Sequence, residues 1–228
     1  YTLLEDEREA LAEAWASLLD FLHRHPDSSE GRALAALIGM GATESKLRGW
    51  LDGFVQARSD WRVMVQDWPA DELMAQYAAL LADELSVDPD DSTPPEAALM
   101  SETFGEHLTC IHDLLVAFKG LGSLKAEMAA HALAASDGAA RFEAASKFLT
   151  GGERRVVKTK KGVGDAAFAR LSQLYDAICT TLAEVGSKRL ARQNWQRGVA
   201  AAALGVRLLA ARDGALRKRN ALGFDDLE

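Results

Sequence analysis

Apolar residues recur at steps of three and four along most of the chain, which is the spacing of one face of an α-helix. Leu11, Trp15, Leu18 and Leu22 follow it, and the pattern predicts an amphipathic helix from about Leu3 to His25. The same spacing predicts further helices at 29–38, 43–69, 71–85, 96–119, 121–135, 137–148, 165–185 and 187–219. The sequence has no β-rich region. The predicted fold class is therefore all-α, an orthogonal or irregular multi-helix bundle.

Two stretches interrupt the helical pattern. Residues 86–95 (SVDPDDSTPP) contain two consecutive prolines and three aspartates, which favour an exposed, extended loop. Residues 149–164 (LTGGERRVVKTKKGVG) are rich in Gly, Lys and Arg, and only 154–158 suits a short extended segment. These breaks divide the chain into an acidic N-terminal helical part (1–85), a loop (86–95) and middle helices (96–148). A basic loop (149–164), long C-terminal helices (165–219) and a final segment (220–228) follow.

The last predicted helix has apolar residues on several sides of its axis, among them Leu190, Trp195 and Val199. A helix of this kind is usually surrounded by protein. Gly198 and Gly205 lie inside it, and each costs roughly 1 kcal/mol relative to Ala. Such glycines are tolerated where another backbone comes close. We therefore expect a central helix with close packing at these two positions.

Charge is distributed unevenly along the chain. Residues 1–140 hold 9 Lys/Arg against 25 Asp/Glu, a net charge of −16, whereas residues 141–219 hold 17 against 6, a net charge of +11. The final nine residues bring the total to −8. An asymmetry of this size indicates a surface for nucleic acid or another polyanion on the basic half. The alternative is that the two halves pack together and neutralise each other.

Size and composition are those of a soluble globular protein. The chain has 228 residues, of which 48% are hydrophobic and 26% charged, enough for one large domain or two small ones. No stretch reaches 18 apolar residues, so no membrane helix is expected. Cys110 and Cys179 are far apart and have apolar neighbours, which predicts reduced, buried thiols in a cytoplasmic protein.

Motifs for nucleotide binding and hydrolysis do not occur in the sequence. The phosphate-binding pattern GxxxxGK[ST], the nucleophile elbow GxSxG and the zinc motif HExxH are all missing. His107, Cys110 and His112 lie within six residues, but helical spacing turns His112 away from the other two. No further metal ligands are indicated. We therefore expect no catalytic residue, no metal site and no cofactor in this segment.

Clustered cations are the best functional candidates. The predicted basic loop carries Arg154, Arg155, Lys158, Lys160 and Lys161, and the predicted last helix carries Lys188, Arg189 and Arg192 on roughly 100° of one face. Such clusters bind phosphates by releasing counterions, without reading sequence. The alternative is a solvated loop that contacts nothing. Phe168 and Trp195 are the only nearby aromatic residues, so a base-stacking platform is not expected.

The segment 216–228 (LRKRNALGFDDLE) resembles the Y-x-x-x-K…LDFxDL element of superfamily 1 DNA helicases of the UvrD/Rep and RecB/AddA type. Two further stretches are similar to that branch: 148–155 (FLTGGERR) to its FLT…GE-R stretch and 1–7 (YTLLEDE) to its F-x-LLDE start. The matched positions of the tail are Lys218, Leu222, Phe224, Asp225, Asp226 and Leu227. Gly223 departs from the family Asp, and Asp213 lies near the position of its Tyr.

The resemblance implies the helical insertion, or 1B subdomain, of an ATP-dependent 3′→5′ DNA helicase that acts in DNA repair and recombination, including double-strand break repair. In that family the ATP and Mg²⁺ sites lie in the motor domain on either side of the insertion. The implied partners are duplex or forked DNA, the motor and, in helicase–nuclease complexes, a second subunit. We accordingly expect the motor domain to flank this segment.

Two other classes of function fit parts of the sequence. The first alternative is a stand-alone helical interaction protein whose acidic half binds a basic partner. The second is a small metal-dependent helical enzyme, which the missing ligand set disfavours.

Overall fold

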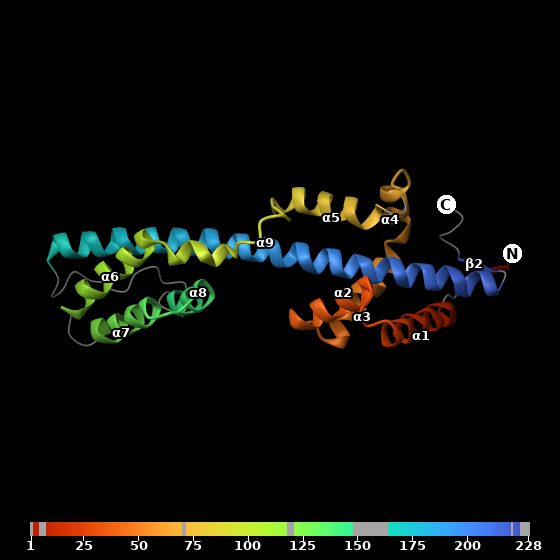
Figure 1. Cartoon of the computed structure of the whole chain (residues 1–228), viewed down its shortest axis with the longest axis horizontal. Coiled ribbons are helices and arrows are strands. Elements are labelled where there is room, and N and C mark those ends of the chain that lie inside the picture. The colour runs from red at the N-terminus through yellow and green to blue at the C-terminus, as the bar shows by residue number, and fades with distance from the viewer. Residues whose placement is uncertain are drawn as a thin grey trace. The chain divides into compact units, whose positions relative to one another are not determined.

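The computed structural model describes residues 2–4, 8–69, 72–117, 121–147, 164–219 and 221–223 (Figure 1). The regular elements of this part of the chain are helices, apart from two strands of three residues each. The all-α prediction is confirmed at this coarse level. The chain forms two compact units, one made of residues 1–89 and 193–228 and the other of residues 90–192. The first unit is therefore discontinuous in sequence and the second is continuous.

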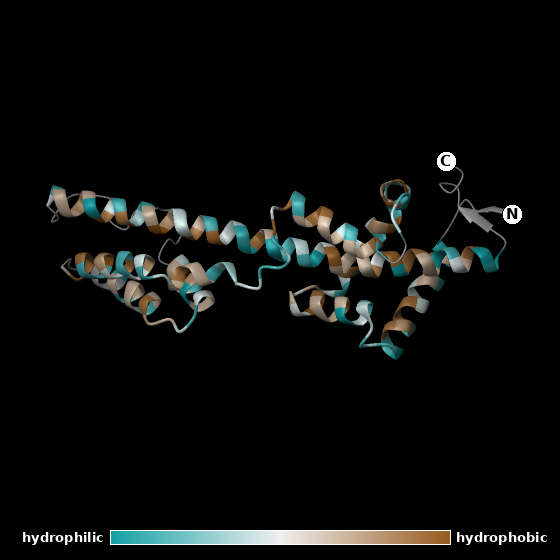
Figure 2. Cartoon of the chain, turned by 45° about the horizontal axis from the view of Figure 1, so that its top comes forward, coloured by the Kyte–Doolittle hydropathy of each residue, from teal (hydrophilic) through white to brown (hydrophobic). Residues whose placement is uncertain are grey.

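Among the described residues, the discontinuous unit contains five helices, the end of a sixth and the two strands. The helices are α1 (Arg8–Arg24), α2 (Ser29–Gly39), α3 (Glu44–Gln56), α4 (Arg58–Val65), α5 (Leu73–Glu84) and the C-terminal part of α9 (Asp165–Lys218). Leu18, Leu37, Leu51, Leu204 and Leu208 form its buried centre. Each of these helices carries both hydrophobic and hydrophilic residues (Figure 2).

Side-chain caps begin two of these helices. The Ser28 hydroxyl accepts a hydrogen bond from the backbone N–H of Gly31, and the Thr43 hydroxyl accepts one from Lys46. Each satisfies a donor that the first helical turn leaves without an intrahelical partner. A Cβ at Gly31 would collide with the backbone carbonyl of Pro26, so the turn before α2 requires glycine there.

A short parallel ribbon was not predicted. Strand β1 (Thr2–Leu4) pairs with β2 (Ala221–Gly223), with Thr2 opposite Ala221 and Leu4 opposite Gly223. Three-residue strands lack the length over which alternation of apolar and polar residues becomes recognisable. The ribbon places two segments that are 219 positions apart side by side (Figure 1).

The continuous unit contains a 3₁₀ turn η1 (Pro95–Met100), α6 (Glu102–Val116), α7 (Leu121–Leu133), α8 (Gly138–Lys147) and the N-terminal part of α9. Leu108, Ile111 and Leu115 of α6 face Leu174 and Ile178 of α9 in its core. The predicted helix at 96–119 is thus divided, because Ser101 ends η1 in an extended conformation and caps α6 through the N–H of Phe104.

Arg141 of α8 is 8% exposed and is fixed by backbone carbonyls. Its Nε donates to Ala132 O at 3.2 Å, its Nη1 to Leu99 O at 3.0 Å and its Nη2 to Leu133 O at 3.1 Å. Two of these carbonyls lie in the last turn of α7, where helices run out of intrahelical donors, and Ala132 O also accepts from the N–H of Ala135 at 3.4 Å. The side chain therefore joins α7, α8 and η1 and caps a helix C-terminus with positive charge.

Helix α9 is continuous over 54 residues, whereas two helices were predicted. The break was expected at Gly186, but the ring of Phe142 packs 3.5 Å from the position of a Cβ there, and the helix continues. Gly198 and Gly205 do lie at close contacts. The approaching groups are the side chain of Leu81 and the ring of Phe54, so the expectation of a neighbouring backbone was wrong. Within each unit α9 supplies core residues, as predicted for a central helix.

Candidate nucleic-acid interface

The predicted cationic surface falls into two parts. Arg154, Arg155, Lys158, Lys160 and Lys161 of the basic loop, together with the predicted extended segment 154–158, lie outside the described residues. Lys188, Arg189 and Arg192 all lie on α9 within the continuous unit.

Arg189 is held by two carboxylates and an aromatic ring. Its Nε lies 3.2 Å from Oε1 of Glu96, and its Nη1 lies 3.2 Å from Oε1 of Glu143. The guanidinium also lies over the ring of Phe142, 5.3 Å from the centroid. Glu96 is 9% exposed, so this pair is shielded from solvent more than a surface ion pair. Arg189 therefore joins η1 and α8 to α9, and its charge is balanced locally.

Arg192 fixes the loop before η1. Its Nη1 donates to the carbonyl oxygen of Thr93 at 2.9 Å. Asp91 beside it has a lowered pKa, chiefly because the backbone N–H and hydroxyl of Thr93 donate to its carboxylate, with smaller effects from the charges of Arg192 and Lys188. This carboxylate offsets part of the positive charge of the cluster.

Lys188 is the member of the cluster that faces solvent. Within the described part of the chain, its ammonium makes no ion pair or hydrogen bond. An exposed lysine on a rigid helix can bind a phosphate oxygen without first leaving a partner. The described geometry therefore separates the three cations: Lys188 can contact an external anion, while Arg189 and Arg192 organise the unit.

Other cations of residues 141–219 divide in the same way. Lys147, Arg170 and Arg217 are exposed. Near the end of α9, Lys218 lies 3.2 Å from Glu13, and Arg219 lies 3.1 Å from Glu9 and 3.3 Å from Glu13. The pKa of Glu13 is lowered, mainly by the hydrogen bond from Lys218. Exposed pairs of this kind contribute little to stability, so a phosphate could replace the carboxylates at small cost.

The residues of the family-like tail are only partly described. Lys218 lies in the last turn of α9 and Leu222 lies in β2, whereas Phe224, Asp225, Asp226 and Leu227 lie outside the described residues. Asp213, near the position of the family Tyr, accepts hydrogen bonds from Arg62 at 3.3 and 3.2 Å and from Arg212 at 3.0 Å. Its carboxylate thus joins α4 to α9.

Sequence reasoning missed the acidic partners of Arg189. Glu96 and Glu143 are 93 and 46 positions away, and no local pattern links either to the arginine.

The cysteine prediction was also wrong in part. Both thiols are free, but Cys110 is exposed, because α6 turns Leu108 and Ile111 inward and leaves Cys110 between them facing out.

Neither a metal centre nor a membrane span is found in the described part of the chain. No group of three or more His, Cys, Asp or Glu there is arranged to hold a metal ion. No helix there combines the length and apolar character needed to cross a bilayer.

Comparison with known proteins finds no matching family model, curated protein or solved structure.

Proposed function

We propose that this chain is a DNA-contacting helical subdomain of an ATP-dependent 3′→5′ DNA helicase of repair and recombination, equivalent to the helical 1B insertion of the first motor domain. Three stretches that resemble the RecB/AddA branch support the proposal, at residues 1–7, 148–155 and 216–228. They occur in the order that the branch has.

The parallel pairing of β1 and β2 is the observation that carries the proposal. Leu3 and Leu4 belong to the first family-like stretch, and Leu222 belongs to the last. The ribbon brings these stretches together, with Leu3 opposite Leu222. A module inserted into another domain must leave that domain and return to it at neighbouring points. The ribbon provides this geometry.

The subdomain would contribute phosphate contacts rather than chemistry. Lys188 is exposed on α9, and the loop cations Lys158, Lys160 and Lys161 are three of the 17 Lys and Arg residues of the basic half. Together they would hold duplex or forked DNA without sequence preference. ATP and Mg²⁺ would bind to the motor domain. We expect the 228-residue chain alone to hydrolyse no ATP.

Fluorescence anisotropy of a labelled forked duplex, measured at several salt concentrations, tests the proposal. We expect weak binding that decreases steeply with salt. Changing Lys158, Lys160 and Lys161 to Ala removes up to three phosphate contacts, and the slope of log affinity against log salt should decrease by about 2.7. Lys188→Ala should reduce it by about 0.9.

A charge-matched control separates specific contacts from a change in net charge. Arg8, Arg24 and Lys46 lie on the acidic half, and their triple Ala variant loses the same three charges. It should bind the fork with the parent salt slope. Equal binding by the parent and the loop variant would refute the loop as the contact. An equal loss of affinity in both triple variants would show that the effect comes from net charge alone.

The second candidate is a stand-alone helical interaction module, and the local neutralisation of the cations favours it. Arg189 pairs with Glu96 and Glu143, and Arg219 pairs with Glu9 and Glu13, so several described cations of the basic half meet carboxylates of the chain. The flanking coding sequence distinguishes the two. The helicase proposal requires GxxxxGK[ST] upstream and an acidic Mg²⁺-binding pair downstream.

A further inference from the structure

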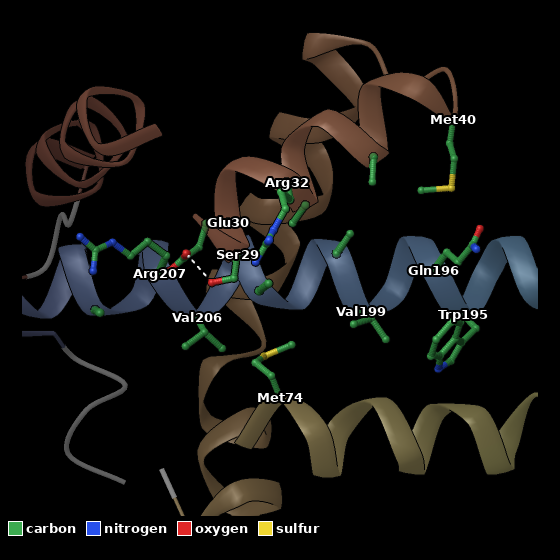
Figure 3. A pocket seen from close by; sticks show the side chains of 15 residues that line it. Ser29, Glu30, Arg32, Met40, Met74, Trp195, Gln196, Val199, Val206 and Arg207 are labelled. Atoms are coloured by element: carbon green, nitrogen blue, oxygen red, sulfur yellow. Dashed lines mark hydrogen bonds between the residues drawn. The ribbon is translucent and has the colours of Figure 1, made fainter. Parts of the chain in front are cut away.

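The discontinuous unit contains an elongated groove of about 770 Å³ that the DNA proposal does not use. Its floor is α9, one wall is α2, and Met74 of α5 lies at the opposite edge (Figure 3). Both walls are fixed to the floor. Trp195 Nε1 donates to Ala78 O of α5 at 2.9 Å, and Arg197 Nη2 donates to Met40 O at the end of α2 at 3.3 Å. The groove is therefore formed before any ligand arrives.

The floor is one stripe of α9. Gln196, Val199, Ala203, Val206 and Ala210 line it at steps of three and four, and these side chains are half-buried or exposed. The stripe runs from Gln196 to Ala210, 14 helical steps that span about 21 Å. Along this length no described helix covers the face of α9 between α2 and α5. The face has the periodicity and apolar character of a helix-packing surface.

The wall is lined by small residues. Ala33 and Ala36 of α2 line the groove, as do Ala200 and Ala203 of the floor. Because helix separation depends on the side chains at the contact, alanine on both sides allows a third helix to approach closely. An extended peptide is a poorer fit, since strand addition requires backbone donors and acceptors that these helices already use internally.

One end of the groove is polar and carries a net positive charge. Ser29, Glu30, Arg32 and Arg207 lie there, on α2 and α9 (Figure 3). Arg207 is held over the ring of Phe21, 3.8 Å from its centroid. The side chain of Arg32 is exposed, and among the described residues it has no ion-pair partner.

The carboxylate at this end is already satisfied. The Ser29 hydroxyl donates to Glu30 at 2.8 Å. Burial alone would raise the pKa of Glu30, but hydrogen bonds from Ser29 and from backbone, and the charge of Arg207, lower it. The two arginines therefore exceed the single carboxylate, and the positive end of the α2 dipole adds to them. An incoming group at this end is favoured to be anionic.

From these features we propose that the groove binds an amphipathic α-helix of a partner protein. Its apolar face would pack on the α9 stripe, and an Asp or Glu would lie beside Arg32 and Arg207. This site is independent of the proposed DNA contacts, because none of its lining residues is among the cations assigned to DNA.

A labelled synthetic helix tests this assignment on the 228-residue chain. The probe is a 14-residue peptide with Ala and Leu on one face, Gln and Lys elsewhere and one Glu near an end, followed by anisotropy. We expect saturable binding. Arg32→Glu should weaken it about fivefold, and a peptide with Lys in place of Glu should bind the variant better than it binds the parent.

Steric filling of the floor provides a second, independent readout. Ala203→Trp should weaken binding at least tenfold, about 1.4 kcal/mol, while Ala35→Trp on α2, which does not line the groove, should leave it unchanged. Circular dichroism checks that both variants fold. Failure of the peptide to saturate the parent, or binding that Ala203→Trp does not affect, would overturn the proposal. Self-association that Ala203→Trp abolishes would instead assign the groove to a second copy of this chain.

Discussion

Removing the guanidinium of Arg141 should destabilise the continuous unit more than any exposed substitution in it. Arg141→Met keeps the apolar stem but leaves the carbonyls of Leu99, Ala132 and Leu133 without their charged donor. A hydrogen bond to a charged group contributes about 1.5–3 kcal/mol, and a buried acceptor left without a donor costs about 1–3 kcal/mol. These terms overlap. We therefore expect a loss of about 3–5 kcal/mol in the free energy of unfolding.

Urea denaturation followed by far-ultraviolet circular dichroism measures the loss, and hydrogen exchange locates it. All five tryptophans lie in the discontinuous unit, so tryptophan fluorescence alone would not report on this region. Amides of η1, α7 and α8 should exchange faster in the variant. Arg170→Met is the matched control because Arg170 is exposed on α9 of the same unit, and it should change stability by less than about 0.5 kcal/mol.

Arg141→Lys distinguishes the charge from the geometry. A single ammonium cannot reach three carbonyls in the fixed directions that the planar guanidinium serves, so we expect most of the loss to remain. A cost below about 1 kcal/mol for Arg141→Met would refute the reasoning, because it would mean that water or other donors satisfy the three carbonyls.

Two further predictions concern packing and pH. Gly205→Ala gains about 1 kcal/mol of helix propensity but places a Cβ against the ring of Phe54. Urea denaturation should therefore show a net loss of stability, which Phe54→Leu should partly restore. A stabilised Gly205→Ala variant would show that the ring moves freely. Burial, followed by the charge of Cys179, raises the pKa of Tyr175 far above its usual 10.0. The unfolded state therefore ionises first: the stabilising contribution is complete below pH 10 and decreases by about 1.4 kcal/mol for each pH unit above it. Tyr175→Phe should lose less stability than the parent between pH 10 and 11, and parallel curves would contradict this assignment.

Local signals in the sequence were sufficient for most helices. Helices were predicted to start at 29 and 43, and the structure starts α2 at Ser29 and α3 at Glu44, each with the preceding hydroxyl accepting from its first turn. The apolar period placed Leu18 and Leu22 on one face of the first helix, and both are buried in the core of the discontinuous unit. These features depend on neighbours within four positions, which is the range that a periodic pattern describes.

Features that depend on distant residues could not be predicted in this way. A break between two helices was predicted at Gly186. In the structure α9 continues through this position, where the ring of Phe142 from α8 packs against it. The charge count found the basic half, yet it could not show that Arg189 meets Glu96 while Lys188 faces solvent. The groove over the α9 stripe likewise exists only after α2 and α5 have taken their places.

The discontinuity of the first unit affects the order in which the protein can fold during synthesis. Ribosomes add roughly 5–20 residues per second, so the partner of Thr2 at Ala221 emerges about 10–45 s later. Residues 90–192 form a complete unit before then, whereas helices α1 to α5 still lack the central α9 segment that covers their inner faces. The middle of the chain can thus reach its final structure first. The N-terminal third carries exposed apolar surface during this interval, and it is the region most in need of chaperone protection.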